Sequence, residues 1–203
     1  SIGGYSPAKI QRYQDLIERY LVSEINSVKM TVNGAATISE ISDNLPTIPV
    51  LSMLNGKYII IGAEYPPVVN GQAMGNCWIV DSAVHASSPD EEISLLGITD
   101  LHNTAVIGAD FAEAREKLDS LSTLAMTDIA PADSVWMTSY APNELRYRSR
   151  LNGERAVVFS EIYYPAGWHL TIDGEPAEIF RADWILRAAF IPAGEHEIVM
   201  RFD

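Results

Sequence analysis

Aromatic, basic and acidic side chains are concentrated between Tyr163 and Trp184, and such a mixture of side chains can bind sugars. Aromatic rings stack on the apolar faces of sugar rings, while arginine, aspartate and histidine can hydrogen-bond to their hydroxyl groups. The candidate glycan contacts are Tyr164, His169, Arg181, Asp183 and Trp184. On a β-sandwich, aromatic residues at strand starts mostly cover the end of the core, and the residues alone favour that structural role. A weak glycan-binding surface is the alternative.

Trp168 and Trp184 are expected to differ in role. In "WHLTI" the alternation of a strand places Trp168, Leu170 and Ile172 on one face, and the last two are aliphatic, as a core-facing row requires. We expect Trp168 to cover the end of the core beside Tyr163 or Tyr164, with His169 pointing outward.

Trp184 opens the expected strand "WILRAAF", directly after "RAD". It is the better candidate for an exposed stacking residue, with Arg181 and Asp183 as its polar neighbours. A stacking contact of this kind is worth on the order of 1 kcal/mol, so binding would be weak.

Catalytic and metal-binding patterns are not found. The four histidines have no zinc spacing, and "VFSEIYY" lacks the glycines of a nucleophile elbow. The acidic run "SPDEE" is explained by helix capping, and the single cysteine, Cys77, fits a small buried apolar residue. We predict no catalytic residue, no metal site and no cofactor.

The charge of the chain argues against nucleic acid as a partner. The 203 residues carry 27 Asp and Glu against 14 Lys and Arg, for a net charge of −13. Such a surface repels phosphate backbones, and no basic cluster offsets it locally.

The pattern of elements predicts an α+β protein. Residues 1–131 alternate helix and strand signals, including a buried strand in "KYIII", one strand in "NCWIVDSAVHA" and a helix capped by Ser88 in "SSPDEEISLLG". Residues 132–203 contain seven short strand candidates and read as an antiparallel β-sandwich. Asp173-Gly174 predicts a two-residue type I′ hairpin turn.

An amphipathic helix is predicted over residues 7–24, capped by Ser6 with Pro7 in its first turn. Its apolar face contains Ile10, Tyr13, Ile17, Tyr20 and Leu21. That face either packs on the domain itself or docks against a membrane-embedded partner.

The C-terminal stretch "AVVFSEIYYPAGWHLTIDGEPAEIFRADWILRAAFIPAGEHEIVMRF" resembles the extracytoplasmic C-terminal region of the YfhO family of bacterial multi-pass membrane proteins, most closely those of Bacteroidetes. Upstream stretches such as "IGGYSPAKIQRYQDLI", "PVLSMLNGKYIII" and "MTSYAPN" are similar as well. The family pattern is matched at Ser160, Glu161, Tyr163, Tyr164, Pro165, Gly167, Trp168, Asp173, Gly174, Arg181, Arg187, Pro192, Gly194 and His196.

The resemblance implies a parent protein that is a membrane glycosyltransferase of the lipid-linked-sugar type, acting on cell-envelope glycans. The catalytic loop of such enzymes lies in the membrane region, so this chain is expected to be a non-catalytic module on the periplasmic face of the inner membrane. Its expected partners are the membrane-embedded region of the same protein and an envelope glycan or lipid-linked sugar. The alternative is a structural or protein-interaction module of an envelope complex.

Overall fold

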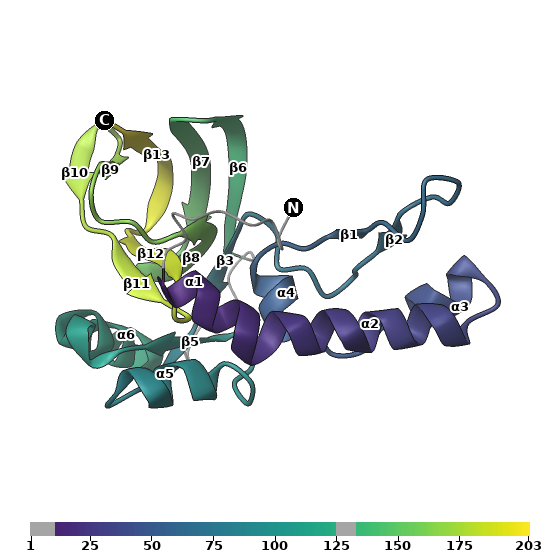
Figure 1. Ribbon diagram of the computed structural model, residues 1–203. Coiled ribbons are helices and arrows are strands. Elements are labelled where there is room, and N and C mark those ends of the chain that lie inside the picture. Colours follow the sequence, from purple (N-terminus) through teal and green to yellow (C-terminus); the bar gives the residue numbers. More distant parts are fainter. Residues whose placement is uncertain (1–10, 125–132) are drawn as a thin grey trace. The chain divides into compact units, whose positions relative to one another are not determined.

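The computed structural model describes residues 11–124 and 133–203 (Figure 1). The chain forms two compact units, Ser1–Gly75 and Asn76–Asp203. Helices dominate the first unit and antiparallel sheets the second, which confirms the α+β prediction. The boundary lies at Gly75/Asn76 and not at the predicted 131/132, because the first strand from "NCWIVDSAVHA" pairs with a strand of the C-terminal part.

The first unit is built on a long helix composed of α1 (Gln11–Leu16), a π-helical turn η1 (Ile17–Leu21) and α2 (Val22–Gly34). The helix extends ten residues beyond the predicted end at residue 24. The predicted cap, Ser6 and Pro7, and the apolar Ile10 lie outside the described residues. A π-turn rotates the residues that follow it relative to a regular helix. Around this turn the fully buried side chains are those of Leu16 and Leu21, whereas the predicted core residue Ile17 is only half-buried.

A buried carboxylate joins this helix to α4 (Pro49–Met53). Glu24 accepts hydrogen bonds from the backbone N–H groups of Val50 (3.0 Å) and Leu51 (2.8 Å), two of the unpaired donors at the start of α4. Burial raises the pKa of Glu24, and the two backbone hydrogen bonds oppose that shift. Asn55, with a φ of 56°, follows the end of α4.

The rest of the first unit comprises α3 (Ile38–Asp43) and a short hairpin of β1 (Tyr58–Ile59) and β2 (Val68–Val69). The prediction that "KYIII" is a buried strand is wrong. Only two of its residues are in a strand, and Tyr58 and Ile60 are exposed. A short, one-sided hairpin cannot cover both faces of an apolar run.

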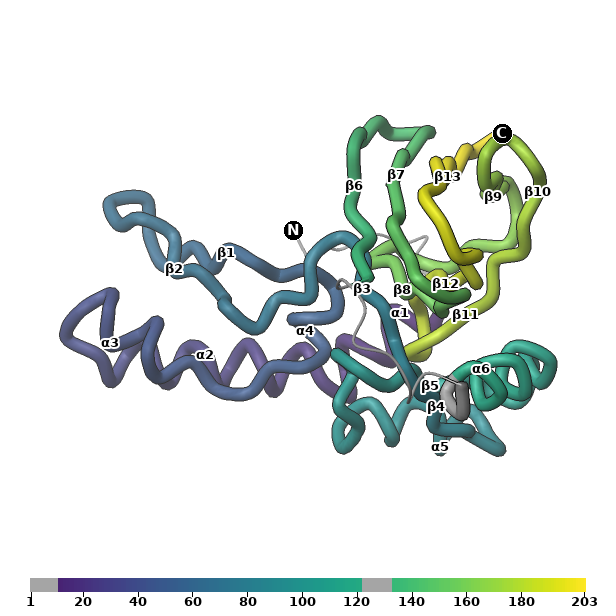
Figure 2. Tube along the Cα trace, turned by 180° about the vertical axis from the view of Figure 1, so that it is seen from behind, coloured from purple at the N-terminus to yellow at the C-terminus, as the bar shows by residue number. Residues whose placement is uncertain are grey.

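The second unit contains two antiparallel sheets packed face to face, which confirms the predicted sandwich. The five-stranded sheet has the order β10-β9-β13-β7-β6, and the four-stranded sheet has the order β11-β12-β8-β3. Strands β6, β7 and β13 lie side by side in both views (Figures 1 and 2). The bounds are β3 (Cys77–Val80), β6 (Ser134–Ala141), β7 (Glu144–Leu151), β8 (Arg155–Ile162), β9 (Trp168–Ile172), β10 (Glu175–Ala177), β11 (Phe180–Ala182), β12 (Leu186–Ile191) and β13 (Gly194–Phe202).

The core lies between these sheets. Tyr147 of β7 packs edge-on against Phe159 of β8, with ring centroids 4.9 Å apart. The strict alternation in "LRYRSRL" buries Leu145, Tyr147 and Leu151 and leaves Arg148 and Arg150 exposed. Period-2 patterning therefore sets the inner face of β7.

A layer of helices and a parallel strand pair completes the second unit. It consists of β4 (Ser82–His85), α5 (Pro89–Leu95), β5 (Thr104–Ile107), the short 3-10 helix η2 (Ala109–Phe111) and α6 (Ala112–Leu124). The single strand predicted in "NCWIVDSAVHA" is two strands: β3 pairs with β8, and β4 pairs with β5. Ser88 caps α5 as predicted, with its hydroxyl accepting from the Glu91 N–H (3.2 Å).

No helix in the described ranges, 11–124 and 133–203, is long and apolar enough to cross a membrane.

The Asp173-Gly174 turn joins β9 to β10, and both residues have positive φ (52° and 89°), as a type I′ turn requires. We expect Gly174→Val to destabilise the protein by about 1–3 kcal/mol, because β-branched residues are strained at positive φ. Urea unfolding measures the effect. Gly153→Val is the control, since a Cβ at Gly153 also meets open space and its φ is not in the left-handed region. Equal losses in the two variants would contradict the turn assignment.

Candidate functional site

A pocket of about 400 Å³ opens at one edge of the sandwich, where β9 and β10 of one sheet face β12 of the other. Four segments form it: the loop that follows β8, the two strands of the Asp173-Gly174 hairpin, the connection from β10 to β11, and β12. Its lining residues are Tyr163, Tyr164, Pro165, Trp168, His169, Leu170, Thr171, Pro176, Ala177, Ile179 and Arg187. The pocket thus combines aromatic side chains with one buried cation.

Two of the predicted glycan contacts, Tyr164 and His169, lie at this pocket. Tyr164 is 47% exposed and follows Tyr163 in the loop after β8, so its ring is accessible to a ligand. His169 points outward from β9, as predicted from the alternation, and its Nε2 lies 3.8 Å from a carboxylate oxygen of Asp203. The sequence therefore identified part of the rim of the pocket.

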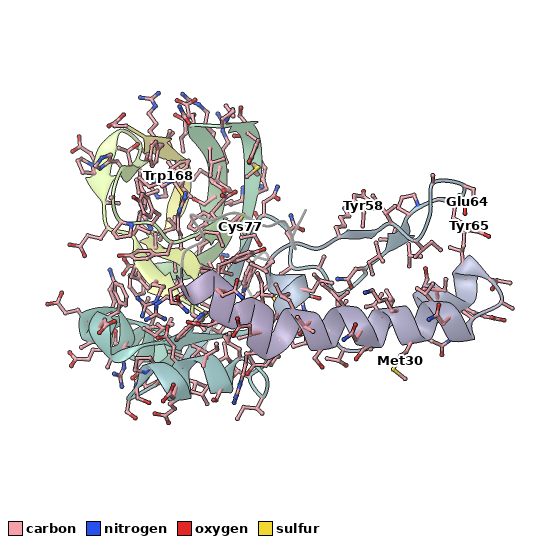
Figure 3. The ribbon with its side chains drawn as sticks, viewed as in Figure 1. Met30, Tyr58, Glu64, Tyr65, Cys77 and Trp168 are labelled. Carbon is pink, nitrogen blue, oxygen red and sulfur yellow. The ribbon has the colours of Figure 1, made fainter. Side chains whose placement is uncertain are left out.

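Trp168 is half-buried and packs against the sandwich core, which confirms its predicted structural role. Leu170, on the same face of β9, is buried. The ring partner of Trp168 is Phe202, at a centroid distance of 5.5 Å, and not the expected Tyr163 or Tyr164. Trp168 also forms a wall of the pocket (labelled in Figure 3).

The loop before β9 is shaped by Gly167. This residue has a φ of +100°, and a Cβ built on it would approach the Phe202 ring to 2.8 Å. The Asp203 N–H donates to the Gly167 carbonyl oxygen at 3.0 Å. Glycine therefore allows the loop to pass close to the end of β13, which fixes where Trp168 enters the strand.

Arg187 of β12 is the charged residue of the pocket, and it is only 3% exposed. It has the same strand parity as Ala189 and Ile191, both members of the core, so its side chain enters the space between the sheets. Its guanidinium carbon lies 3.9 Å from the centroid of the Trp168 ring, a cation–π contact.

The hydrogen bonds of Arg187 within the described residues are few. Its Nε donates to the carbonyl oxygen of Ile162 (2.9 Å), and Nη1 lies 3.6 Å from the sulfur of Met200. In the part of the chain that the structure describes, no acidic side chain forms an ion pair with it. Burial lowers the pKa of Arg187, and the negative charge of Glu161 partly offsets this effect.

The predictions for Trp184, Arg181 and Asp183 as exposed ligand contacts are wrong. All three are buried, with exposed fractions of 5%, 7% and 0%. Asp183 and Trp184 occupy the tight connection from β11 to β12 with positive φ values of 50° and 71°. This connection packs against β5: Asp183 N–H donates to the Val106 carbonyl (2.8 Å), and Val106 N–H donates to Asp183 Oδ1 (2.8 Å).

Arg181 is engaged inside the protein. Its Nε and Nη2 donate to the two carboxylate oxygens of buried Glu92 of α5, at 3.3 and 3.2 Å. Nη2 also lies 3.4 Å from Asp110, and the guanidinium lies 5.1 Å from the Phe111 ring centroid. Arg181 therefore holds the sandwich and the helical layer of the second unit together.

Sequence reasoning missed Arg187 as a pocket residue, although a signal was present. "LRAAFI" places an arginine in the same alternating row as Ala189 and Ile191, where a core strand has apolar residues. A charged side chain at a core-facing strand position costs free energy unless it is paired. Such a residue therefore indicates a functional site more strongly than a charged residue on the surface does.

Groups for other chemistry are scarce among the described residues, where no cluster of three or more metal-ligating side chains occurs. Burial raises the pKa of the Cys77 thiol to about 12, so this group is not an activated nucleophile. A second hollow of about 320 Å³ adjoins Trp136 on the outer face of the five-stranded sheet, but charged residues along it already pair, as Arg150 does with Glu195 (2.8 Å). The Arg187 pocket is thus the better-built ligand site.

Comparisons with protein-family models, with curated proteins and with solved structures gave no match for this chain.

Proposed function

We propose that this chain is a non-catalytic, extracytoplasmic module of a YfhO-type membrane glycosyltransferase, and that the sandwich-edge pocket holds a sugar of the glycan acceptor or of the lipid-linked donor. The observation that carries the proposal is the convergence of Tyr163, Tyr164 and Trp168 around one pocket. Aromatic walls match the apolar faces of sugars, and Arg187 supplies hydrogen-bonding groups. The sequence resemblance supports the placement at the cell envelope.

A binding assay tests this proposal on the 203-residue chain. We expect envelope-type oligosaccharides and simple methyl glycosides to bind with millimolar to high micromolar affinity in NMR-monitored titrations. Tyr164→Ala should weaken binding about fivefold or more, because one stacking contact is worth about 1 kcal/mol. Its effect on unfolding should stay within about 0.5 kcal/mol, since about half of the residue is exposed and it lies in a loop.

Tyr140→Ala is the matched control. Tyr140 is also an exposed tyrosine of the second unit, but it lies on β6 and does not line the pocket. We expect its affinity for the same sugars to equal that of the parent. No binding of any sugar at 20 mM by the parent chain would overturn the proposed function, and equal losses in the two variants would overturn the location of the site.

A second candidate function, protein interaction, is favoured by a different surface. In the first unit Met30, Tyr58, Ile60 and Tyr65 are exposed, and three of them are labelled in Figure 3 as Met30, Tyr58 and Tyr65. Exposed apolar side chains of this size around the β1–β2 hairpin are typical of surfaces that dock a partner, whereas Met30 projects from the opposite side of α2 (Figure 3). Such docking concerns the first unit and is compatible with a sugar pocket in the second.

A further inference from the structure

We propose that the pocket selects sugars that carry an anionic group, a carboxylate or a phosphate, and that Arg187 binds this group. The inference rests on the proposed sugar-binding function and adds the chemical class of the ligand. It starts from the position of a nearly fully buried guanidinium that also lines an open pocket.

The first observation is the spare hydrogen-bonding capacity of Arg187. A guanidinium has five N–H donors and is protonated at any physiological pH. In this protein Nε uses its hydrogen on Ile162, and Nη1 has only a sulfur atom at 3.6 Å. Nη2 has no acceptor among the residues that the structure describes. At least one terminal edge of the guanidinium is therefore available to a ligand.

The second observation is that Arg187 forms no ion pair with an acidic side chain among the described residues. Burying a cation costs several kcal/mol unless an anion lies close to it. Glu161 of β8 interacts with Arg187 electrostatically but forms neither an ion pair nor a hydrogen bond with it. Burial raises the pKa of Glu161, and the charge of Arg187 opposes that shift. A ligand anion in the pocket would supply the direct ion pair that Glu161 does not make.

The third observation is the orientation imposed by Trp168. Its ring covers one face of the guanidinium at 3.9 Å, so the planar edges and not this face remain for polar contacts. Arginine edges match carboxylate and phosphate oxygens, which they bind with two parallel hydrogen bonds. Tyr164 at the rim would then stack on the sugar ring that carries the anion.

The net charge of the protein explains why an anionic sugar must be recognised by a cation at short range. The chain carries a net charge of −13, so its long-range field repels anions. Selection for an acidic sugar consequently needs a desolvated cation at short range, which is what Arg187 offers. Affinity for the bare anion, without the sugar, should stay low.

The test compares matched ligands by NMR titration of the parent chain. The probes are methyl β-glucoside, methyl β-glucuronide and glucose 1-phosphate, with acetate and inorganic phosphate as anions without a sugar. We expect at least one of the two charged sugars to bind about tenfold or more tightly than the neutral glucoside. The difference between the uronate and phosphate arms identifies the source of the charge. Both simple anions should bind more weakly than the preferred charged sugar.

The Arg187→Gln variant should lose this preference, with charged and neutral sugars binding within twofold of each other. If Arg187→Gln does not fold, Arg187→Lys keeps the charge without the planar fork, and its preference for the charged sugar should fall at least threefold. Equal affinity of the parent chain for charged and neutral sugars would overturn the inference and leave sugar binding intact. A preference that survives unchanged in the arginine variants would overturn the assignment to Arg187, whereas binding of no sugar would overturn the proposed function itself.

Discussion

Arg181→Ala should destabilise the second unit by about 3–5 kcal/mol, one of the largest effects of any single substitution in this protein. Arg181 and Glu92 form a bidentate pair at 3.3 and 3.2 Å, and both side chains are almost completely buried. Removing the guanidinium leaves the Glu92 carboxylate buried without its cation. The cation–π contact with Phe111 is lost as well.

Urea unfolding measures this loss, and Arg150→Ala provides the contrast. Arg150 makes a shorter ion pair, 2.8 Å to Glu195, but about two thirds or more of each side chain is exposed to solvent. Solvent screening reduces such pairs to a few tenths of a kcal/mol. The loss of stability should therefore follow the burial of each ion pair and not its N–O distance, so that Arg181→Ala costs more than Arg150→Ala. Comparable losses in Arg181→Ala and Arg150→Ala would show that the Glu92 site is well solvated.

Asp183→Asn should change how stability depends on pH. Asp183 is completely buried, and its pKa is raised to about 7, first by burial and then by the nearby charge of Glu92, while the Val106 hydrogen bond opposes the shift. A carboxyl group whose pKa is higher in the folded protein than in the unfolded chain stabilises the fold while it is protonated. Its contribution is full below the unfolded value, near 3.8, and is lost as pH rises through about 7.

The free energy of unfolding of the parent should therefore fall between pH 5 and pH 8 by more than that of the variant. Asparagine keeps an oxygen for the Val106 N–H, tolerates the positive φ and does not ionise. One pKa unit corresponds to about 1.4 kcal/mol, so we expect the difference between variant and parent to shift by roughly 1–3 kcal/mol across this range in favour of the variant. A difference that is constant from pH 5 to pH 8 would show that Asp183 is ionised throughout.

Local signals in the sequence predicted local structure well. The Asp173-Gly174 turn, the Ser88 cap of α5 and the alternation of β7 each depend on residues within a few positions of one another. Turn and cap chemistry is decided by φ, by a side-chain oxygen and by the nearest backbone donors. These features therefore do not depend on contacts with residues that are distant in the sequence.

Long-range pairing was less predictable. β3 and β4 are separated by one residue, yet β3 is the edge strand beside β8, and β4 pairs in parallel with β5. Two apolar strand runs in direct succession look like one strand, because the partner of each is distant in sequence. The π-turn at Ile17–Leu21 likewise leaves no periodic signal, and the two fully buried residues of this segment, Leu16 and Leu21, are five positions apart.

In the candidate site, too, local features were predicted better than long-range contacts. Tyr164 and His169 were identified because their loop and strand parity are local properties. Arg181, Asp183 and Trp184 are near the pocket residues in sequence, but hydrogen bonds to Val106 and Glu92 direct this segment towards β5 and α5. Those partners are more than seventy residues away, so sequence proximity alone suggested a shared surface that does not exist.

The most direct test of the sugar pocket is a backbone amide footprint of the isotope-labelled chain during titration with methyl β-glucuronide or glucose 1-phosphate. We predict that the shifted resonances cluster at residues 163–171, 176–179 and 187, with the indole N–H of Trp168 among them. Resonances around Trp136, on the outer face of the five-stranded sheet, should stay unchanged. A footprint centred on Trp136, or one confined to the first unit, would contradict the assignment of the pocket as the ligand site.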